Sequence, residues 1–204
     1  MNYFAHLVLS QPTLESTVGN LLGDFAKGVD REQLNPAVSF GLDNHRAVDR
    51  FTDAQESIQA LKRLFSPQRR RFAGIALDVY FDHLLMTHWQ NFDTRPLQTA
   101  IDTFYQRMVE GRDLMPSQNM RNTTQRMVEY DWFGSYRELD SIAHALDRIA
   151  SRLRFANRFD GSIEDILANQ EAIDEVFLKF FPLLKSHVAM LQIEANNQPP
   201  SPDS

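Results

Sequence analysis

The chain has 204 residues, enough for one well-buried domain, and its 43% hydrophobic content with 15 Phe supplies a substantial core. It has no cysteine, which excludes disulfides, thiolate metal sites and cysteine nucleophiles. No apolar run approaches the roughly 18 residues of a membrane span, the start lacks a basic leader, and the formal net charge of -6 argues against general nucleic-acid binding. We therefore expect a cytoplasmic protein without membrane or nucleic-acid partners.

Helical periodicity runs through most of the chain, and proline and glycine fall mainly between the periodic segments. We expect an all-α fold with a single compact multi-helix domain over residues 1–195. The polar, proline-rich tail at 196–204 is expected to be disordered. The predicted helices cover about 13–29, 32–53, 54–65, 68–91, 95–112, 117–133, 135–155, 163–168 and 170–194.

The first predicted helix contains GNLLGDFAKG, in which Asp24 lies among apolar residues. Gly19 and Gly23 permit close helix packing or the approach of backbone to a ligand. A carboxylate in an apolar setting needs a partner. That partner could be a metal ion, or an arginine across a helix interface such as Arg46 or Arg50.

The next segment, DNHRAVDRFTD, carries polar residues at helical spacing. His45, Asp49 and Asp53 follow one another at i+4, so they share one face of a helix. His45 and Asp49 could give two ligands to one metal, or the carboxylate could orient the imidazole. The alternative is a set of surface ion pairs with Arg46 and Arg50, each worth about 0.3–0.5 kcal/mol.

A basic patch follows, with five cationic residues within ten positions of an otherwise acidic protein. This local charge suits an acidic partner or a phosphate group, although a solvated helix end and loop explains it equally well. The patch consists of Lys62, Arg63, Arg69, Arg70 and Arg71.

The segment IALDVYFDHLLMTHW predicts a helix that is apolar almost all the way round and is therefore buried. It nevertheless carries Asp78, Asp82, His83 and His88. Asp78 and Asp82 lie one above the other at i+4, and His83 is turned about 100° away from them. Two carboxylates and a nearby imidazole suit a hard or borderline divalent cation.

Histidine and aspartate cluster in the first 90 residues, which indicates that the N-terminal half carries the function. His6, in YFAHLVL, belongs to this group, although a single histidine in an apolar run is more often a hydrogen-bonded core residue than a ligand. Mixed His and Asp ligands without cysteine suit Mn, Mg or Fe better than structural Zn. The group is His6, Asp24, His45, Asp49, Asp78, Asp82, His83 and His88.

Five segments in this order, NYFAHLVLS, GNLLGDFAKG, HRAVDRFTD, LDVYFDHLLMTHW and FLKFFPLL, resemble the acyl carrier protein phosphodiesterase family. The resemblance extends to about residue 190 and includes YDWFGSYRELDSIAHALDRIASR. It implies hydrolysis of the phosphodiester that joins 4′-phosphopantetheine to a serine of holo acyl carrier protein, which leaves the apo carrier. It also implies an HD-phosphohydrolase-like fold and a divalent metal, with Mn²⁺ expected and Mg²⁺ or Fe²⁺ as alternatives.

With this activity, Asp49 would position the water or orient a ligand, and Arg46 or Arg50 would clamp a phosphate oxygen. The basic patch would steer the small, acidic carrier. The order Asp82-His83 is the reverse of an HD doublet. The metal ligands that we predict from the sequence are Asp24, His45, Asp78, Asp82 and His83.

Two alternatives remain. An HD-like phosphohydrolase that acts on a nucleotide or another phosphodiester would share the scaffold and the metal chemistry. A non-catalytic helical protein could instead bind acyl carrier protein through its arginines, and buried ion pairs would then account for the Asp and His residues.

Overall fold

The computed structural model describes residues 1–153 and 158–195, and within these ranges the chain is helical and contains no strand. The all-α prediction is therefore confirmed, whereas the HD-like detail stays a prediction. The predicted disordered tail at 196–204 lies outside the described residues. The α helices are α1 (Tyr3–Val8), α2 (Leu14–Leu22), α3 (Pro36–Ala54), α4 (Glu56–Leu64), α5 (Ala73–Thr87), α6 (Leu97–Glu110), α7 (Gln118–Glu129), α8 (Trp132–Ser135), α9 (Leu139–Arg152), α10 (Ser162–Ala168) and α11 (Gln170–Leu191).

Short 3₁₀ turns account for most differences from the predicted boundaries. The helix predicted at 13–29 is shorter in the structure, where α2 is followed only by the turn η1. The helix predicted at 68–91 corresponds to α5 with a 3₁₀ turn, η3 or η4, at each end. Pro36 occupies the first turn of α3, where its missing N–H costs nothing, so this helix begins later than predicted. The turns are η1 (Gly23–Phe25), η2 (Arg31–Gln33), η3 (Arg70–Phe72), η4 (Trp89–Asn91) and η5 (Gly111–Leu114).

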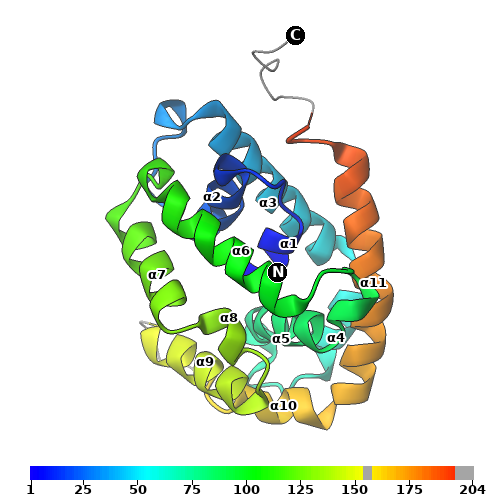
Figure 1. Cartoon of the computed structure of the whole chain (residues 1–204). Coiled ribbons are helices and arrows are strands. Elements are labelled where there is room, and N and C mark those ends of the chain that lie inside the picture. Colours follow the sequence, from blue (N-terminus) through cyan, green and yellow to red (C-terminus); the bar gives the residue numbers. More distant parts are fainter. Residues whose placement is uncertain (154–157, 196–204) are drawn as a thin grey trace.

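The first helix, α1, is absent from the sequence prediction. It has six residues, too few to be stable alone in water, and the Asn2 side chain makes no cap hydrogen bond. In the fold, α1 lies inside the bundle against α2 and α5, as Figure 1 shows. Phe4 is fully buried there and contacts Trp89, Phe104 and Phe133. Tertiary packing therefore supplies the stability that the segment lacks by itself.

Two glycines allow α2 and α3 to pack closely. A Cβ on Gly19 would lie 2.3 Å from the carbonyl oxygen of Val38 and 2.7 Å from Cα of Gly41. A Cβ on Gly41 would lie 2.9 Å from Cα of Gly19, so neither position has room for a side chain. The close helix packing predicted for Gly19 is therefore present, and it brings the residues after α2 next to the middle of α3.

The helices that follow enclose this centre. α11 runs along one side of the bundle, and α7 and α9 lie on the opposite side (Figure 1). Phe177 and Phe181 of α11 pack against Phe92, which extends the aromatic core to that side. Within the described residues, no helix has both the length and the apolar character that a bilayer crossing requires.

Candidate functional site

Two histidines and an aspartate from α1 and α3 form a compact cluster. His6, His45 and Asp49 each offer one ligand atom, and these atoms lie within 4.8 Å of one another. The Nε2 atom of His45 is 3.0 Å from Oδ2 of Asp49, and the Nε2 atom of His6 is 3.3 Å from Oδ1. Two imidazoles and one carboxylate within this span match the donor set of a divalent metal such as Mn²⁺, Fe²⁺ or Zn²⁺.

A hydrogen bond and close packing fix the orientation of the His45 ring. Its Nδ1 atom donates to the carbonyl oxygen of Asn20 at 2.7 Å, which turns Nε2 toward Asp49. Gly23 makes room for the ring, since a Cβ there would lie 2.0 Å from Nε2 of His45. A hydrogen bond from the second ring nitrogen to a backbone carbonyl is the usual way in which proteins orient a metal-binding histidine.

His6 is fully buried and stacks on the ring of His45, with 3.7 Å between the ring centroids. Burial lowers the pKa of His6 to about 3, so its imidazole is neutral at physiological pH. Its Nδ1 atom is buried and has no hydrogen-bond partner among the described residues. A neutral imidazole is the form that binds a metal ion.

Asp49 is the anionic member of the cluster. Burial would raise its pKa, but hydrogen bonds from His45 and His6 and the charge of the Met1 amino group together lower it. The Met1 nitrogen lies 3.2 Å from Oδ1 of Asp49 and 3.0 Å from Oδ1 of Asp78. Asp49 is therefore ionised. For His45, burial opposes the charged ring, but Asp49 and Asp24 outweigh this effect and raise the pKa.

A cleft of about 280 Å³ adjoins the cluster through Met1. Asp24 from η1 and Asp78 from α5 line it, and burial raises the pKa of Asp24 to about 6 and also raises the pKa of Asp78. Arg148 and Arg152 of α9 line the same cleft. The cleft thus combines one carboxyl, Asp24, that can carry a proton near neutral pH with guanidinium groups that can bind an anion.

Asp82 has a structural contact rather than a place in the cluster. Its two carboxylate oxygens accept the backbone N–H groups of Phe4 at 3.0 Å and Ala5 at 2.9 Å. These are free donors in the first turn of α1, so Asp82 caps that helix from across the interior. These two hydrogen bonds to Asp82 stabilise the start of α1, the helix that carries His6.

His83 does not belong to the cluster of His6, His45 and Asp49. Its Nδ1 atom donates to the carbonyl oxygen of Tyr136 at 2.9 Å, and its ring stacks on Tyr80. The structure therefore does not bring His83 together with His45 and Asp49. Of the predicted ligands, His45 is in the cluster and Asp24 and Asp78 line the adjoining cleft.

The predicted phosphate and partner residues lie elsewhere. Arg46 and Arg50 are exposed on α3 and do not line the cleft. In the basic patch, Arg69 pairs with Glu164 at 2.9 Å, and Lys62 pairs with Asp53 at 2.8 Å. Arg70 donates to the carbonyl oxygen of Phe65, Arg63 is exposed, and Arg71 lies over the ring of Phe72.

The sequence did not lead us to select Arg148 and Arg152, the two arginines of the cleft, as site residues. It also favoured a role for His6 as a hydrogen-bonded core residue rather than a ligand. Arg148 and Arg152 belong to YDWFGSYRELDSIAHALDRIASR, and their i+4 spacing on α9 is the signal that could have selected them. His6 could have been selected because it is a polar residue within the apolar run YFAHLVL. Nothing in the local sequence places it beside His45, since the two meet only through packing.

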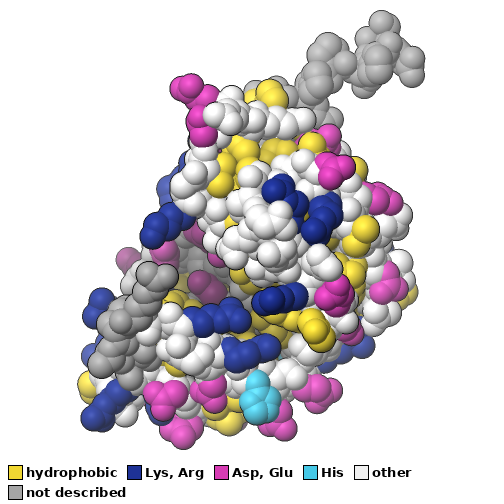
Figure 2. All heavy atoms as spheres, turned by 90° about the vertical axis from the view of Figure 1, so that its left-hand side faces the viewer, with side chains coloured by type: hydrophobic (Ala, Val, Ile, Leu, Met, Phe, Trp, Pro, Cys, Tyr) yellow, Lys and Arg dark blue, Asp and Glu magenta, His cyan; other side chains and the backbone are white. Residues whose placement is uncertain are grey.

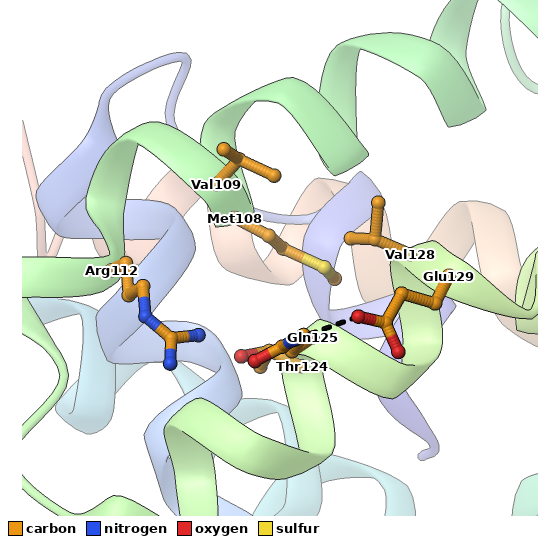
Figure 3. A pocket seen from close by; sticks show the side chains of 7 residues that line it. All are labelled: Met108, Val109, Arg112, Thr124, Gln125, Val128 and Glu129. Atoms are coloured by element: carbon orange, nitrogen blue, oxygen red, sulfur yellow. Dashed lines mark hydrogen bonds between the residues drawn. The ribbon is translucent and has the colours of Figure 1, made fainter.

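A second hollow, of about 420 Å³, lies between α6 and α7 (Figure 3). Gln125 donates to Glu129 at 2.7 Å there, and Arg112 donates to the carbonyl oxygen of Arg121 at 3.2 Å. Met108, Val109 and Val128 form much of the remaining wall. Because its polar groups bond to other protein groups, this hollow lacks the converging donors of the first cleft.

Comparisons with known proteins agree on one family. Residues 1–184 match the family described as acyl carrier protein phosphodiesterase. The chain is 33% identical over 182 residues to the acyl carrier protein phosphodiesterase of Serratia proteamaculans (strain 568), covering 89% of this chain and 94% of the relative. It is 30% identical over 192 residues to the protein of the same name from Escherichia coli (strain K12 / DH10B), covering 93% and 98%. No solved structure matches the chain.

Proposed function

Because the chain belongs to the acyl carrier protein phosphodiesterase family, we propose that it is a cytoplasmic phosphoric diester hydrolase that removes 4′-phosphopantetheine from holo acyl carrier protein. The observation that carries this proposal is the cluster of His6, His45 and Asp49 beside a cleft that contains both carboxyls and arginines. These features together favour phosphodiester hydrolysis, since the phosphate is anionic and resists attack by water.

The metal would be held by His6, His45 and Asp49, with Asp24 and Asp78 as neighbouring carboxylates. We expect Mn²⁺, with Mg²⁺ or Fe²⁺ as alternatives. A bound divalent ion would supply a water of lowered pKa and positive charge against the phosphate. This ligand set differs from the one predicted from the sequence, because Asp82 is engaged with α1 and His83 with Tyr136.

The chain's own residues account for the rest of the reaction. Arg148 and Arg152 line the cleft and would hold the phosphate oxygens, a role for which the planar guanidinium is suited. As the oxygen of water bonds to phosphorus, the water releases one proton, the bond from phosphorus to the serine oxygen breaks, and that oxygen takes up a proton. Asp24, with a pKa of about 6, is our candidate for the group that delivers it.

The test is direct. Protein purified without chelator is incubated with holo acyl carrier protein and Mn²⁺, and mass spectrometry measures the mass of the carrier. We expect the carrier to lose its phosphopantetheine arm, and we expect chelation to stop the reaction. An unchanged carrier with Mn²⁺, Mg²⁺ and Fe²⁺ alike would contradict the proposal.

The ion pairs of Asp49 favour one alternative, a carrier-binding protein without activity. Asp49 already lies within 3.3 Å of the Met1 amino group, His6 and His45, so the site can balance its charges without a metal ion. Elemental analysis of the same preparation separates the two functions. A hydrolase should retain a divalent metal that the H45A variant loses, whereas a binding protein should contain none.

A further inference from the structure

A broad groove of about 950 Å³ lies on the face formed by α7, α8 and α9. Arg126 from α7 and Arg148 and Arg152 from α9 line it, and all three are exposed. Figure 2 shows this side of the molecule, where Lys and Arg side chains gather around a hollow. The overall charge of the protein is negative, so this local excess of positive charge sets the groove apart from the rest of the surface.

The groove arginines are available for a partner. Within residues 1–153 and 158–195, none of the three forms an ion pair with a carboxylate, whereas Arg69 pairs with both Glu164 and Asp165. Arg148 lies over the ring of Trp132, with 5.8 Å between Cζ and the ring centroid. Exposed guanidinium groups without a carboxylate partner can pair with acidic groups of another protein.

One carboxylate, Asp147, also lines the groove, but it has a structural contact. Its Oδ1 atom accepts the backbone N–H of Gly161 at 3.0 Å. Three arginines against one engaged aspartate leave the groove positive. The exposed aromatic ring of Tyr130 and the aromatic ring of Trp132 add the kind of surface that protein interfaces favour.

The groove is continuous with the cleft. Trp132, Arg148 and Arg152 line both of them, so a partner seated in the groove lies directly beside Asp24 and Asp78. At about 280 Å³ the cleft has room for a small extended group but not for a folded protein. A wide outer groove that leads into a narrow reactive cleft suits a substrate in which a protein carries a thin arm.

We propose that this groove docks an acidic face of the carrier protein, with Arg126 as the outermost contact and the arm passing Trp132 into the cleft. The inference rests on the proposed function, because the carrier is the partner named there. It transfers the main docking role from the basic patch at 62–71 to α7 and α9, and it identifies a contact outside the reactive cleft.

Binding of the apo carrier to the metal-free protein tests the docking without any catalytic step. Titration calorimetry compares the parent protein with R126E and R126Q. The matched control is R63E, which reverses one exposed arginine of the basic patch. We expect R126E to weaken binding about tenfold, R126Q to weaken it less, and R63E to change it by less than about twofold. Far-UV circular dichroism checks that every variant is folded.

Hydrolysis of the holo carrier with Mn²⁺ is measured separately. If R126E binds the apo carrier as the parent does, or if R63E is impaired as strongly, the docking site is wrong even when the parent cleaves the carrier. If the parent binds the carrier through Arg126 but does not cleave it, the docking site is supported and the proposed hydrolysis fails. A parent that neither binds nor cleaves the carrier contradicts both.

Discussion

The pair His45 and Asp49 on α3 and the pair Asp82 and His83 on α5 contain the same residue types, but the structure uses them differently. His45 and Asp49 are four residues apart, so they lie on one face of α3 and meet at 3.0 Å. Asp82 and His83 are adjacent, so α5 turns them about 100° apart. Asp82 accepts backbone N–H groups of α1, and His83 donates to the carbonyl oxygen of Tyr136. The partners that the fold gives each pair, more than its residue types, therefore decide which pair can hold a metal ion together.

The largest difference between the two pairs should appear when one histidine is removed from each. We expect H45A to lose its bound metal and to lower kcat/KM for the holo carrier on the order of 100-fold or more, because a ligand is missing. H83A should retain metal and most of its activity while losing stability, since it removes a buried hydrogen bond. Elemental analysis, carrier kinetics and thermal melting measure the three effects. Equal metal loss in H45A and H83A would contradict the assignment of a metal-binding role to His45 alone of these two histidines.

A second prediction concerns the space around His45. In G23A the new Cβ would lie 2.0 Å from Nε2 of His45, so the ring must move. We expect metal affinity and activity to fall roughly 10- to 100-fold, although alanine favours a helix more than glycine does.

The matched control is G74A, whose Cβ would lie 3.5 Å from Cε of Lys62, an ordinary contact with the end of a flexible side chain. Metal titration and carrier kinetics compare the two variants. If G23A and G74A behave alike, Gly23 does not set the position of His45.

The last prediction concerns the structural pair. Burial raises the pKa of Asp82 from 3.8 to about 7, although the N–H groups of Ala5 and Phe4 oppose the shift. Between about pH 4 and pH 7 the folded protein therefore binds this proton more readily than the unfolded chain. The free energy of unfolding should fall as pH rises through this window, by at most about 1.4 kcal/mol per pH unit from this carboxyl.

Asp82→Asn cannot titrate, so its unfolding free energy should depend less on pH than that of the parent. Urea unfolding at several pH values, with chelator present to remove metal binding, measures the difference. An identical slope in both proteins would show that Asp82 titrates alike in the folded and unfolded states.

The sequence allowed most helices to be predicted because their apolar faces repeat at the helical period. It did not predict α1, since six residues cannot form a stable helix without the packing of Phe4 and the carboxylate of Asp82. That omission affected the site as well. The importance of His6 depends on α1 lying against α3, so its role could not be inferred from YFAHLVL.

From the sequence alone it follows that the protein is helical, that any metal site must use His, Asp or Glu, and that His45 and Asp49 share a face. These properties follow from composition and from the geometry of one helix. Packing between helices places His6 beside this pair and lets Asp82 cap α1. It also brings Arg148 and Arg152 to the same cleft as Asp78. The physical reason is that packing between helices, which no local pattern records, brings distant side chains together.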